Sequence, residues 1–305
     1  MTDKPLSHAT AGPVAIIGAG TLGRHLATVF AGGGSDVSIF DVAESQLDAA
    51  RDHVAQHSQN VRQILGLEQA PQGQVNTCTR LEQAVHGAWM VIEAVPEQLE
   101  LKRTVFKELD KVTDADTVLA SNSSSLPSSQ LITHVAHPER VLNTHYYQPT
   151  QLNMVELMSC GKTDQRIIDT LIQLLPAYGL VPFHVRRESD GFIFNRIWAA
   201  IKRECLMVVE EDVAEPQDID EMWRIFIRSG RSPFEAMDHV GLDVVLAIEE
   251  HYAAVRPGLP AGPRKLLRDQ IDRGRLGTKT GRGFYDYAAA PERDSQPTEP
   301  RPGRA

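Results

Sequence analysis

The sequence predicts an α/β fold: a parallel, doubly wound sheet followed by an all-helical C-terminal domain. Two observations support this fold class. Short apolar strand patterns alternate with helical patterns over about the first 185 residues, and such alternation is typical of a parallel sheet with helices on both faces. After Asp190-Gly191 the pattern is helical up to about residue 275, so the second part of the chain is expected to consist of helices.

The elements of the predicted sheet follow one another along the first part of the chain. The apolar run Val14–Ile17 ends in glycine and is typical of a buried parallel strand. A helix over residues 20–32 follows, and Gly32-Gly33-Gly34 ends it. Further strands are predicted at 36–41, 89–93, 117–120, 141–145, 154–158 and 180–185, with helices at 43–65, 97–112 and 164–178.

These patterns divide the chain into three parts. Residues 1–188 form the sheet domain, residues 189–287 form the helical domain, and residues 288–305, rich in Pro, Arg and Glu, are expected to be disordered, as is the lead 1–12. The apolar runs of the helical domain exceed what one small domain needs. Part of its surface is therefore expected to form a homodimer interface.

Composition narrows the class of protein. A hydrophobic share of 42% is ordinary for a globular chain, and a net charge of −9 argues against a nucleic-acid partner, because phosphate binding needs a basic face. Cys78, Cys160 and Cys205 show no metal-ligand spacing and no disulfide framework, which fits free thiols in the cytoplasm. No apolar run approaches the roughly 18–20 residues that span a membrane, and no signal peptide is recognisable.

A glycine turn, Gly18-Ala19-Gly20-Thr21-Leu22-Gly23, separates the first predicted strand from the first helix. In this context the pattern indicates a Rossmann-type dinucleotide site, with the phosphates held at the helix start. Asp41 lies 21 residues after Gly20, where a carboxylate accepts hydrogen bonds from ribose hydroxyls and repels a 2′-phosphate. The predicted cofactor is therefore NAD. The alternative is that the glycines serve packing and Asp41 caps the next helix.

Three polar clusters are expected at the carboxyl edge of the sheet or where the helical domain begins. They are the serine-rich run 121–125, His145 with Glu156, and Asn195. Oxidation of an alcohol needs a base, for which imidazole is suited near neutral pH, and hydrogen-bond donors at the substrate oxygen. Taken singly, each residue has a structural alternative: a solvated histidine, a solvent-facing strand glutamate, or a helix cap.

Together these motifs are more specific, and the chain resembles the L-3-hydroxyacyl-CoA dehydrogenase family over nearly all of residues 13–287. The matching stretches are GAGTLG (18–23), VIEAVPE (91–97) with Lys102, SNSSSL (121–126), His145 with Pro149 and residues 155–156, GFIFNR (191–196) and KTGRGFY (279–285). The resemblance implies a Rossmann-type domain, a helical dimerisation domain and a role in fatty acid metabolism.

The same resemblance implies a role for each candidate residue. His145 matches the family's catalytic base and Glu156 its carboxylate partner. Ser124 and Asn195 match the serine and asparagine that contact the substrate, while Glu97 and Lys102 match positions near the nicotinamide half of NAD.

The sequence departs from the family pattern in three places. Gln148 stands where the family usually has asparagine, and the His145–Glu156 separation of eleven residues is one shorter than usual. A one-residue change turns a strand side chain to the other face, so the loop 148–153 must absorb the deletion if the pair is kept. Acyl-CoA members carry a lysine-bearing arm, whereas residues 42–75 contain no lysine and have a net charge of −2, a poor surface for a polyphosphate.

The leading hypothesis is therefore NAD-dependent oxidation of a 3-hydroxyacyl thioester, with a small free hydroxy acid, as in gulonate or carnitine dehydrogenases, as the alternative substrate. Arg186, Arg187, Lys202 and Arg203 are candidate anion-binding residues or ordinary surface charges. A second hypothesis is a non-catalytic NAD-binding protein. A third is an oxidoreductase that uses a lysine base, for which Lys202 and Lys279 are the candidates.

Overall fold

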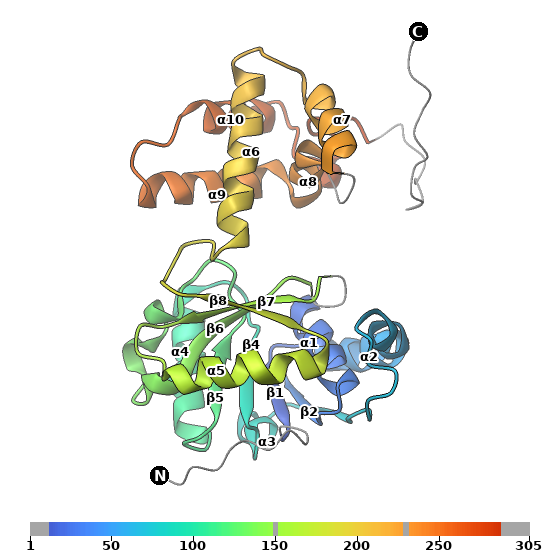
Figure 1. Ribbon diagram of the computed structural model, residues 1–305, viewed down its shortest axis with the longest axis vertical. Coiled ribbons are helices and arrows are strands. Elements are labelled where there is room, and N and C mark those ends of the chain that lie inside the picture. The colour runs from blue at the N-terminus through green and yellow to red at the C-terminus, as the bar shows by residue number, and fades with distance from the viewer. Residues whose placement is uncertain (1–11, 149–151, 228–231, 288–305) are drawn as a thin grey trace. The chain divides into compact units, whose positions relative to one another are not determined.

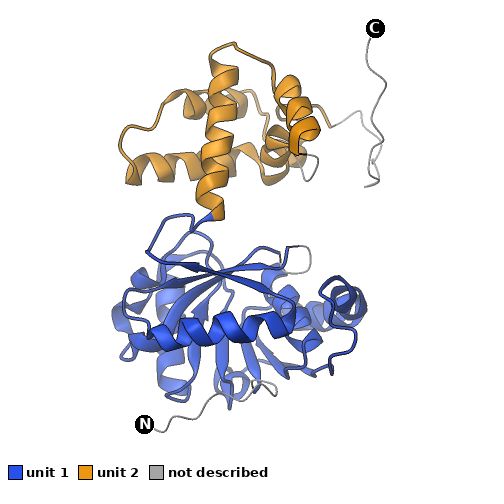
Figure 2. Cartoon of the chain, viewed as in Figure 1, with its two compact units in different colours: residues 1–193 blue, residues 194–305 orange. Residues whose placement is uncertain are grey.

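The computed structural model describes residues 12–148, 152–227 and 232–287 (Figure 1). The chain divides into two compact units, residues 1–193 and 194–305 (Figure 2). The two segments predicted to be disordered lie outside the described residues, apart from Gly12. Among the described residues, no helix combines the length and the apolar character needed to cross a membrane.

Unit 1 is built on an eight-stranded sheet with the order β3-β2-β1-β4-β5-β6-β7-β8. Neighbouring strands are parallel except for β6 and β7, which are antiparallel. The sheet confirms the predicted fold class. The strands are β1 Val14–Ile17, β2 Val37–Phe40, β3 Val75–Cys78, β4 Met90–Glu93, β5 Val118–Ser121, β6 Val141–Tyr146, β7 Met154–Ser159 and β8 Val181–Val185.

The edge strand β3 was not predicted, and its burial explains why. Of its four residues only Cys78 is buried, so the segment lacks the apolar run that reveals the central strands. β3 completes the order 3-2-1-4 of a doubly wound sheet. In that order the chain crosses from the β3 edge back to β4, next to β1, and open α/β sheets bind ligands at such a reversal.

Helices cover both faces of this sheet (Figure 1). Along β1 the side chains alternate, so that Val14 and Ile16 belong to one core cluster and Ala15 and Ile17 to the other. The first cluster is completed by α1 (Thr21–Gly32), α2 (Glu44–Ile64) and α5 (Gln165–Leu174), and the second by α3 (Leu81–Val85) and α4 (Leu99–Val112). The short helix α3 was not predicted.

Unit 2 is helical, as predicted, with α6 (Phe194–Glu210), α7 (Pro216–Ile227), α8 (Pro233–Val240), α9 (Leu242–Val255) and α10 (Gly262–Asp272). Buried side chains from four of these helices, among them Leu206, Phe234 and Leu267, form its core. The buried carboxylate of Asp238 accepts the backbone N–H groups of Phe284 and Tyr285, both at 3.0 Å. The KTGRGFY segment is thereby tied to α8.

Candidate cofactor and catalytic site

In the turn after β1, backbone segments approach each other so closely that two positions require glycine. Gly18 has φ +109°, and a Cβ there would lie 2.7 Å from the carbonyl oxygen of Ala94. A Cβ on Gly23 would lie 1.8 Å from the carbonyl oxygen of Gly18. Both contacts are shorter than van der Waals distance, so the turn and the start of α1 fit together only with glycine at these two positions.

Gly20 differs, because a Cβ there would meet no heavy atom within 4 Å. Gly20 is the N-cap residue of α1 and leaves open space at the start of the helix. Because glycine has no side chain, it cannot cap the N–H groups of the first turn. Uncapped N–H groups and the positive end of the helix dipole favour an anion at this place. The turn therefore fits the pyrophosphate of a dinucleotide.

Asp41 follows β2 and joins the turn to the next helix. Its Oδ2 accepts the N–H of Ala19 at 2.8 Å, and its Oδ1 accepts the N–H of Ala43, the N-cap residue of α2, at 2.9 Å. The carboxylate thus supports the helix start and stands beside the glycine turn at the same time. Each oxygen keeps a further lone pair, as hydrogen bonding to a ribose hydroxyl requires.

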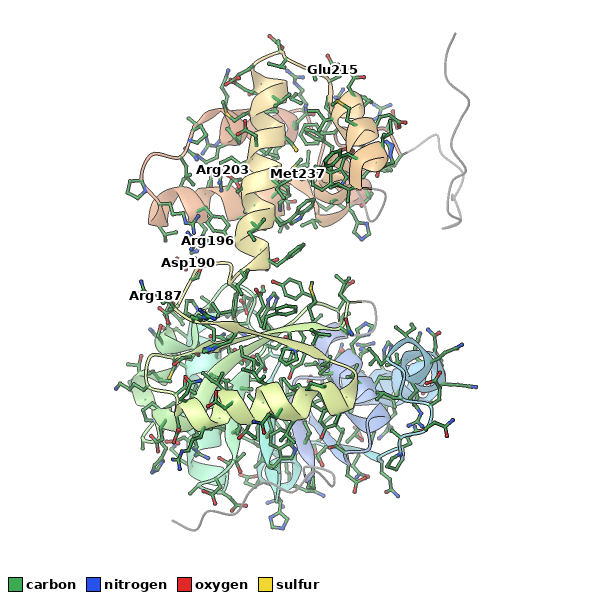
Figure 3. All side chains as sticks on the ribbon, in the orientation of Figure 1. Arg187, Asp190, Arg196, Arg203, Glu215 and Met237 are labelled. Carbon is green, nitrogen blue, oxygen red and sulfur yellow. The ribbon has the colours of Figure 1, made fainter. Side chains whose placement is uncertain are left out.

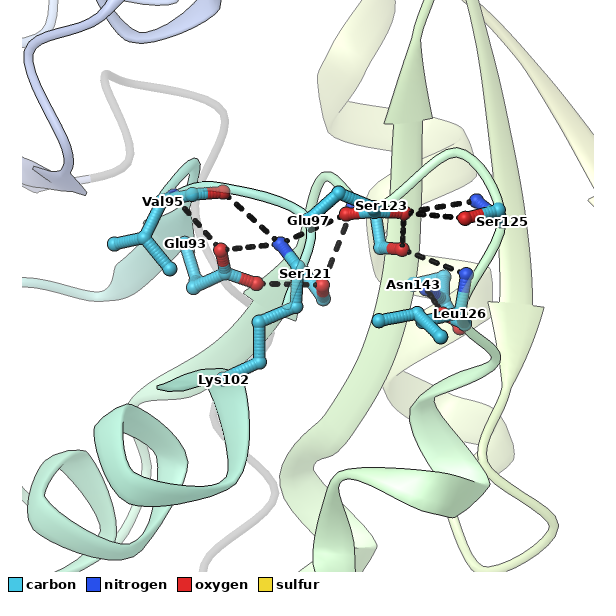
Figure 4. A network of polar contacts seen from close by, with 9 residues as sticks. All are labelled: Glu93, Val95, Glu97, Lys102, Ser121, Ser123, Ser125, Leu126 and Asn143. Atoms are coloured by element: carbon cyan, nitrogen blue, oxygen red, sulfur yellow. Dashed lines mark hydrogen bonds and ion pairs between the residues drawn. The ribbon is translucent and has the colours of Figure 1, made fainter. Parts of the chain in front are cut away.

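A buried ionic network lies at the carboxyl end of β4 (Figure 4). The Lys102 side chain is 2% exposed, and its Nζ lies 2.6 Å from Oε1 of Glu93 and 3.2 Å from Oε2 of Glu97. Burial raises the pKa of Glu93, although Lys102 and the Ser121 hydroxyl act against this shift. Burial also acts to raise the pKa of Glu97. The charge of Lys102 and hydrogen bonds from serine side chains outweigh burial there, so the pKa of Glu97 is lowered.

Glu97 also organises the serine-rich turn that follows β5. Its Oε1 accepts hydrogen bonds from the Ser123 hydroxyl and from both the N–H and the hydroxyl of Ser125. Between them, the Ser124 side chain is exposed, and among the described residues its hydroxyl has no hydrogen-bond partner. The network thus holds the turn by its flanking serines and leaves Ser124 available to a ligand.

His145 and Glu156 face each other across the antiparallel pair of β6 and β7. They are direct partners in the strand register, and Nδ1 of His145 lies 3.4 Å from Oε2 of Glu156. Glu156 is only 2% exposed, so it is not the solvent-facing strand residue of the structural alternative. The spacing of eleven residues therefore keeps both side chains on one face. Gln148 begins the connecting segment with φ +40°, and residues 149–151 lie outside the described part.

Three further groups surround this pair. Phe192 and Ile193 lie in the matching stretch GFIFNR, but the sequence predicted no role for them or for Tyr147. The Tyr147 hydroxyl donates to Oε2 of Glu156, and the Ile193 N–H donates to Oε1 at 2.8 Å. The Phe192 ring packs at a tilt against the imidazole of His145, with the ring centroids 5.0 Å apart. Phe192 has φ +54° and is 2% exposed, so the segment before α6 folds back over the pair.

Four of the remaining candidates belong to unit 2 and two to unit 1. Asn195 is half-buried in the first turn of α6, and Arg203 projects from the middle of that helix (Figure 3). Arg203 forms a buried ion pair with Glu249, its Nε lying 2.7 Å from Oε2. Burial lowers the pKa of Lys202, which is 8% exposed, and Lys279 pairs with Asp243. Arg186 and Arg187 of unit 1 are exposed.

Both arginines of residues 42–75 are held by the protein itself. Arg62 donates to the carbonyl oxygens of Gly32, Glu68 and Ala70, at 2.8, 3.0 and 2.6 Å. Arg51 pairs with Asp48 and donates to the Thr77 hydroxyl. Their guanidinium groups therefore complete local structure.

Comparison with known proteins identifies the family of the chain. The family described as 3-hydroxyacyl-CoA dehydrogenase matches with its NAD binding domain over residues 13–189 and its C-terminal domain over 191–287. A 5-formyl-3-hydroxy-2-methylpyridine 4-carboxylate 5-dehydrogenase of Mesorhizobium japonicum is 31% identical over 90% of each chain. A probable 3-hydroxybutyryl-CoA dehydrogenase of Bacillus subtilis is 30% identical over 90% of this chain and 96% of the relative. The crystal structure of (S)-3-hydroxybutyryl-CoA dehydrogenase from Ralstonia eutropha superposes with a TM-score of 0.80 at 26% identity, covering 92% of this chain and all of that one.

Proposed function

The chain belongs to the 3-hydroxyacyl-CoA dehydrogenase family of NAD-dependent oxidoreductases, and we propose that it interconverts a 3-hydroxyacyl compound and its 3-keto form, with His145 and Glu156 as its acid–base pair. The observation that carries this proposal is the buried contact between Nδ1 of His145 and Oε2 of Glu156, 3.4 Å apart. Bound NAD would supply the hydride acceptor for oxidation of the hydroxyl-bearing carbon, and NADH the hydride donor for the reverse reaction.

The protein's own residues handle the proton. Because Nδ1 of His145 faces Glu156, Nε2 is the nitrogen that takes the proton from the substrate hydroxyl. The carboxylate fixes the tautomer of the imidazole and stabilises the imidazolium that forms. The exposed Ser124 hydroxyl donates to the substrate oxygen. Asn195 is assigned as a second donor on the strength of its place in the family motif.

The cofactor contacts follow from the same edge of the sheet. We assign the pyrophosphate to the turn at Gly18, Gly20 and Gly23, and the adenine ribose to Asp41. Glu97 and Lys102 are assigned to the nicotinamide half. Lys102 is buried beneath Glu97, so we expect it to act by holding that carboxylate rather than by touching the ring.

Replacement of His145 by glutamine tests the proposal. We expect His145→Gln to abolish NADH formation in an absorbance assay, while NADH still binds with nearly unchanged affinity in a tryptophan-quenching titration. His137→Gln, which changes an exposed histidine of the same unit, is the matched control and should keep full turnover. Turnover by His145→Gln equal to that of the control would remove His145 from the mechanism. Absence of turnover in the unaltered protein, with NADH bound, would favour the non-catalytic alternative.

A specific observation favours a free hydroxy acid over a CoA thioester. The two arginines of residues 42–75 are occupied by local contacts, and that segment has no lysine. Burial, with the neighbouring His25 and His57, lowers the pKa of His53 to about 4, so this histidine is neutral near pH 7. The segment therefore offers the CoA phosphates no lysine, and its two arginines are engaged in local contacts. One relative is itself named for a pyridine carboxylate rather than for a CoA ester.

Matched substrate pairs distinguish the two candidates. The panel consists of L-3-hydroxybutyryl-CoA with L-3-hydroxybutyrate, a medium-chain pair of the same kind, carnitine and gulonate. We expect a higher kcat/KM for a free acid than for its thioester. A consistent preference for the thioesters would assign the CoA substrate and show that cations outside residues 42–75 bind the phosphates.

We also propose that the chain forms a homodimer through its helical unit. The helix α7 exposes Met222, Ile225 and Phe226, whose exposed fractions are 70%, 65% and 87%. Large apolar side chains grouped on one helix are typical of an interaction surface. Light scattering after size-exclusion chromatography should give twice the chain mass of 33.7 kDa, and Phe226→Glu should lower it. A single-chain mass at micromolar concentration would contradict the assignment.

A further inference from the structure

We propose that Tyr147 is a positioning residue that sets the basicity of His145 by sharing the carboxylate of Glu156 with it. This inference rests on the proposed role of His145 as the base, and it goes beyond that role. It concerns a side chain that neither the sequence patterns nor the family motif singled out.

Strand geometry brings the three side chains together. His145 and Tyr147 are two residues apart, so they project from the same face, and Glu156 lies directly opposite His145 in the register. The Tyr147 hydroxyl donates to Oε2 of Glu156, the oxygen that lies 3.4 Å from Nδ1 of His145. The second oxygen, Oε1, accepts the Ile193 N–H at 2.8 Å. The phenol and the imidazole therefore share one oxygen, while a backbone group holds the other.

The histidine contact with Glu156 is longer than a usual hydrogen bond. N–H···O hydrogen bonds usually span about 2.7–3.2 Å, so the His145 contact of 3.4 Å is long, and the Tyr147 hydroxyl donates to the same oxygen of Glu156. When a phenol O–H donates to a carboxylate oxygen, that oxygen becomes a weaker hydrogen-bond acceptor for other donors. A carboxylate shared in this way stabilises the imidazolium of His145 less than one that His145 holds alone, so Tyr147 sets how strongly Glu156 supports the base.

The aromatic rings around His145 have a separate role. The Tyr147 ring lies 4.2 Å from the imidazole, and the Phe192 ring lies 5.0 Å from it. These contacts hold the plane of the base whether or not Tyr147 carries a hydroxyl. Tyr147→Phe therefore removes the bond to Glu156 and keeps the packing, which separates tuning of the base from its support.

The first test compares the pH dependence of kcat/KM for substrate oxidation in the unaltered protein and in Tyr147→Phe. Loss of the phenol frees Oε2 for His145, so the acid limb should move to higher pH by about half a unit to one unit. Tyr146→Phe is the control, since Tyr146 lies on the opposite face of β6 and packs against Phe30. Its acid limb should not move.

The second test asks whether the effect passes through Glu156. In a Glu156→Gln background no carboxylate remains to be shared, so adding Tyr147→Phe should leave the acid limb where Glu156→Gln puts it. An unmoved acid limb in Tyr147→Phe, or an equal shift with and without Glu156, would overturn the inference. Lower turnover with an unchanged pH profile would mean that Tyr147 only supports the fold.

A direct titration separates this inference from the proposed function. The His145 ring is titrated by NMR in the protein without substrate, where no turnover is needed. The pKa of His145 should be higher in Tyr147→Phe than in the unaltered protein, even if His145→Gln shows that another residue is the base. Equal titration curves would overturn the tuning whatever the kinetics show.

Discussion

The strongest energetic prediction concerns the buried pair of Lys102 and Glu93. Their side chains are 2% and 0% exposed, and Nζ lies 2.6 Å from Oε1. Replacing Lys102 by methionine preserves the aliphatic stem but leaves Glu93, among the described residues, with the Val95 N–H and the Ser121 hydroxyl as partners. Removing one member of a buried pair costs about 3–5 kcal/mol, because the other charge is left buried without its counterion.

The stability loss is measured by urea and thermal unfolding of the complete chain. For a unit of this size the cost corresponds to a decrease of roughly 6–20 °C in the unfolding temperature. Lys111→Met is the matched control, because Lys111 lies on the same helix in an exposed pair with Glu108, and it should change stability by less than about 0.5 kcal/mol. The double variant Lys102→Met/Glu93→Gln should recover part of the loss, since no charge remains buried.

The loss of stability in Lys102→Met should also depend on pH. Burial raises the pKa of Glu93 in the folded protein, and loss of Lys102 removes the main opposing influence. A carboxyl whose folded pKa is raised binds its proton more tightly when folded, so the stability it contributes is present at low pH and lost as pH rises toward the folded pKa. The deficit of Lys102→Met should therefore be smaller at pH 5 than at pH 8. A deficit no larger than that of Lys111→Met, or one independent of pH, would refute the reasoning.

Three further predictions follow from single contacts. Asp41→Ala should raise the KM for NAD about ten- to a hundredfold and that for NADP much less, because it removes the carboxylate that we assign to the ribose hydroxyls and that would repel a 2′-phosphate. An unchanged NAD-to-NADP ratio of KM values would contradict this assignment. Asp238→Asn should lower the free energy of unfolding by about 1–3 kcal/mol in urea titrations. The reason is that a neutral amide replaces the carboxylate that accepts hydrogen bonds from Phe284, Tyr285 and Tyr287. A loss below about 0.5 kcal/mol would argue against this role. Arg140 lowers the pKa of Asp110 against the effect of burial, so this pair's stabilisation is present above the unfolded pKa and is lost as pH falls through the folded one. Asp110→Asn should accordingly flatten the decline of the unfolding temperature below about pH 4, and an unchanged slope would contradict the assignment.

Local features of the site were predictable from the sequence because their chemistry is local. The turn at Gly18–Gly23 depends on neighbouring backbone, and Asp41 directly follows β2, which pairs with β1, the strand before the turn. The edge strand β3 was missed because three of its four residues are not buried. Lys102, which matches a family position near the nicotinamide half of NAD, is buried and paired with Glu93, and its place on a helix did not reveal this pairing.

Contacts that depend on the pairing register of strands could not be predicted from the sequence. The short His145–Glu156 spacing raised the prospect of opposite faces, yet the two residues are paired directly in the ladder. The Ile193 N–H reaches Glu156 from 37 positions along the chain, and no motif reveals a backbone donor. Tyr147 could have been suspected from its distance of two residues from His145 on an alternating strand, but its bond to Glu156 requires the observed pairing of β6 and β7.

The most direct test of the acid–base pair is the single-turnover rate of NADH formation by Glu156→Gln, measured with saturating NAD and substrate. The amide is nearly isosteric with the carboxylate but cannot stabilise the imidazolium of His145. We expect a rate about a hundred- to ten-thousandfold below that of the unaltered protein, with unchanged NADH binding. Glu139→Gln, a change on the same unit away from the pair, should leave the rate unaltered. A Glu156→Gln rate equal to that of Glu139→Gln would contradict the assignment of His145 and Glu156 as the acid–base pair.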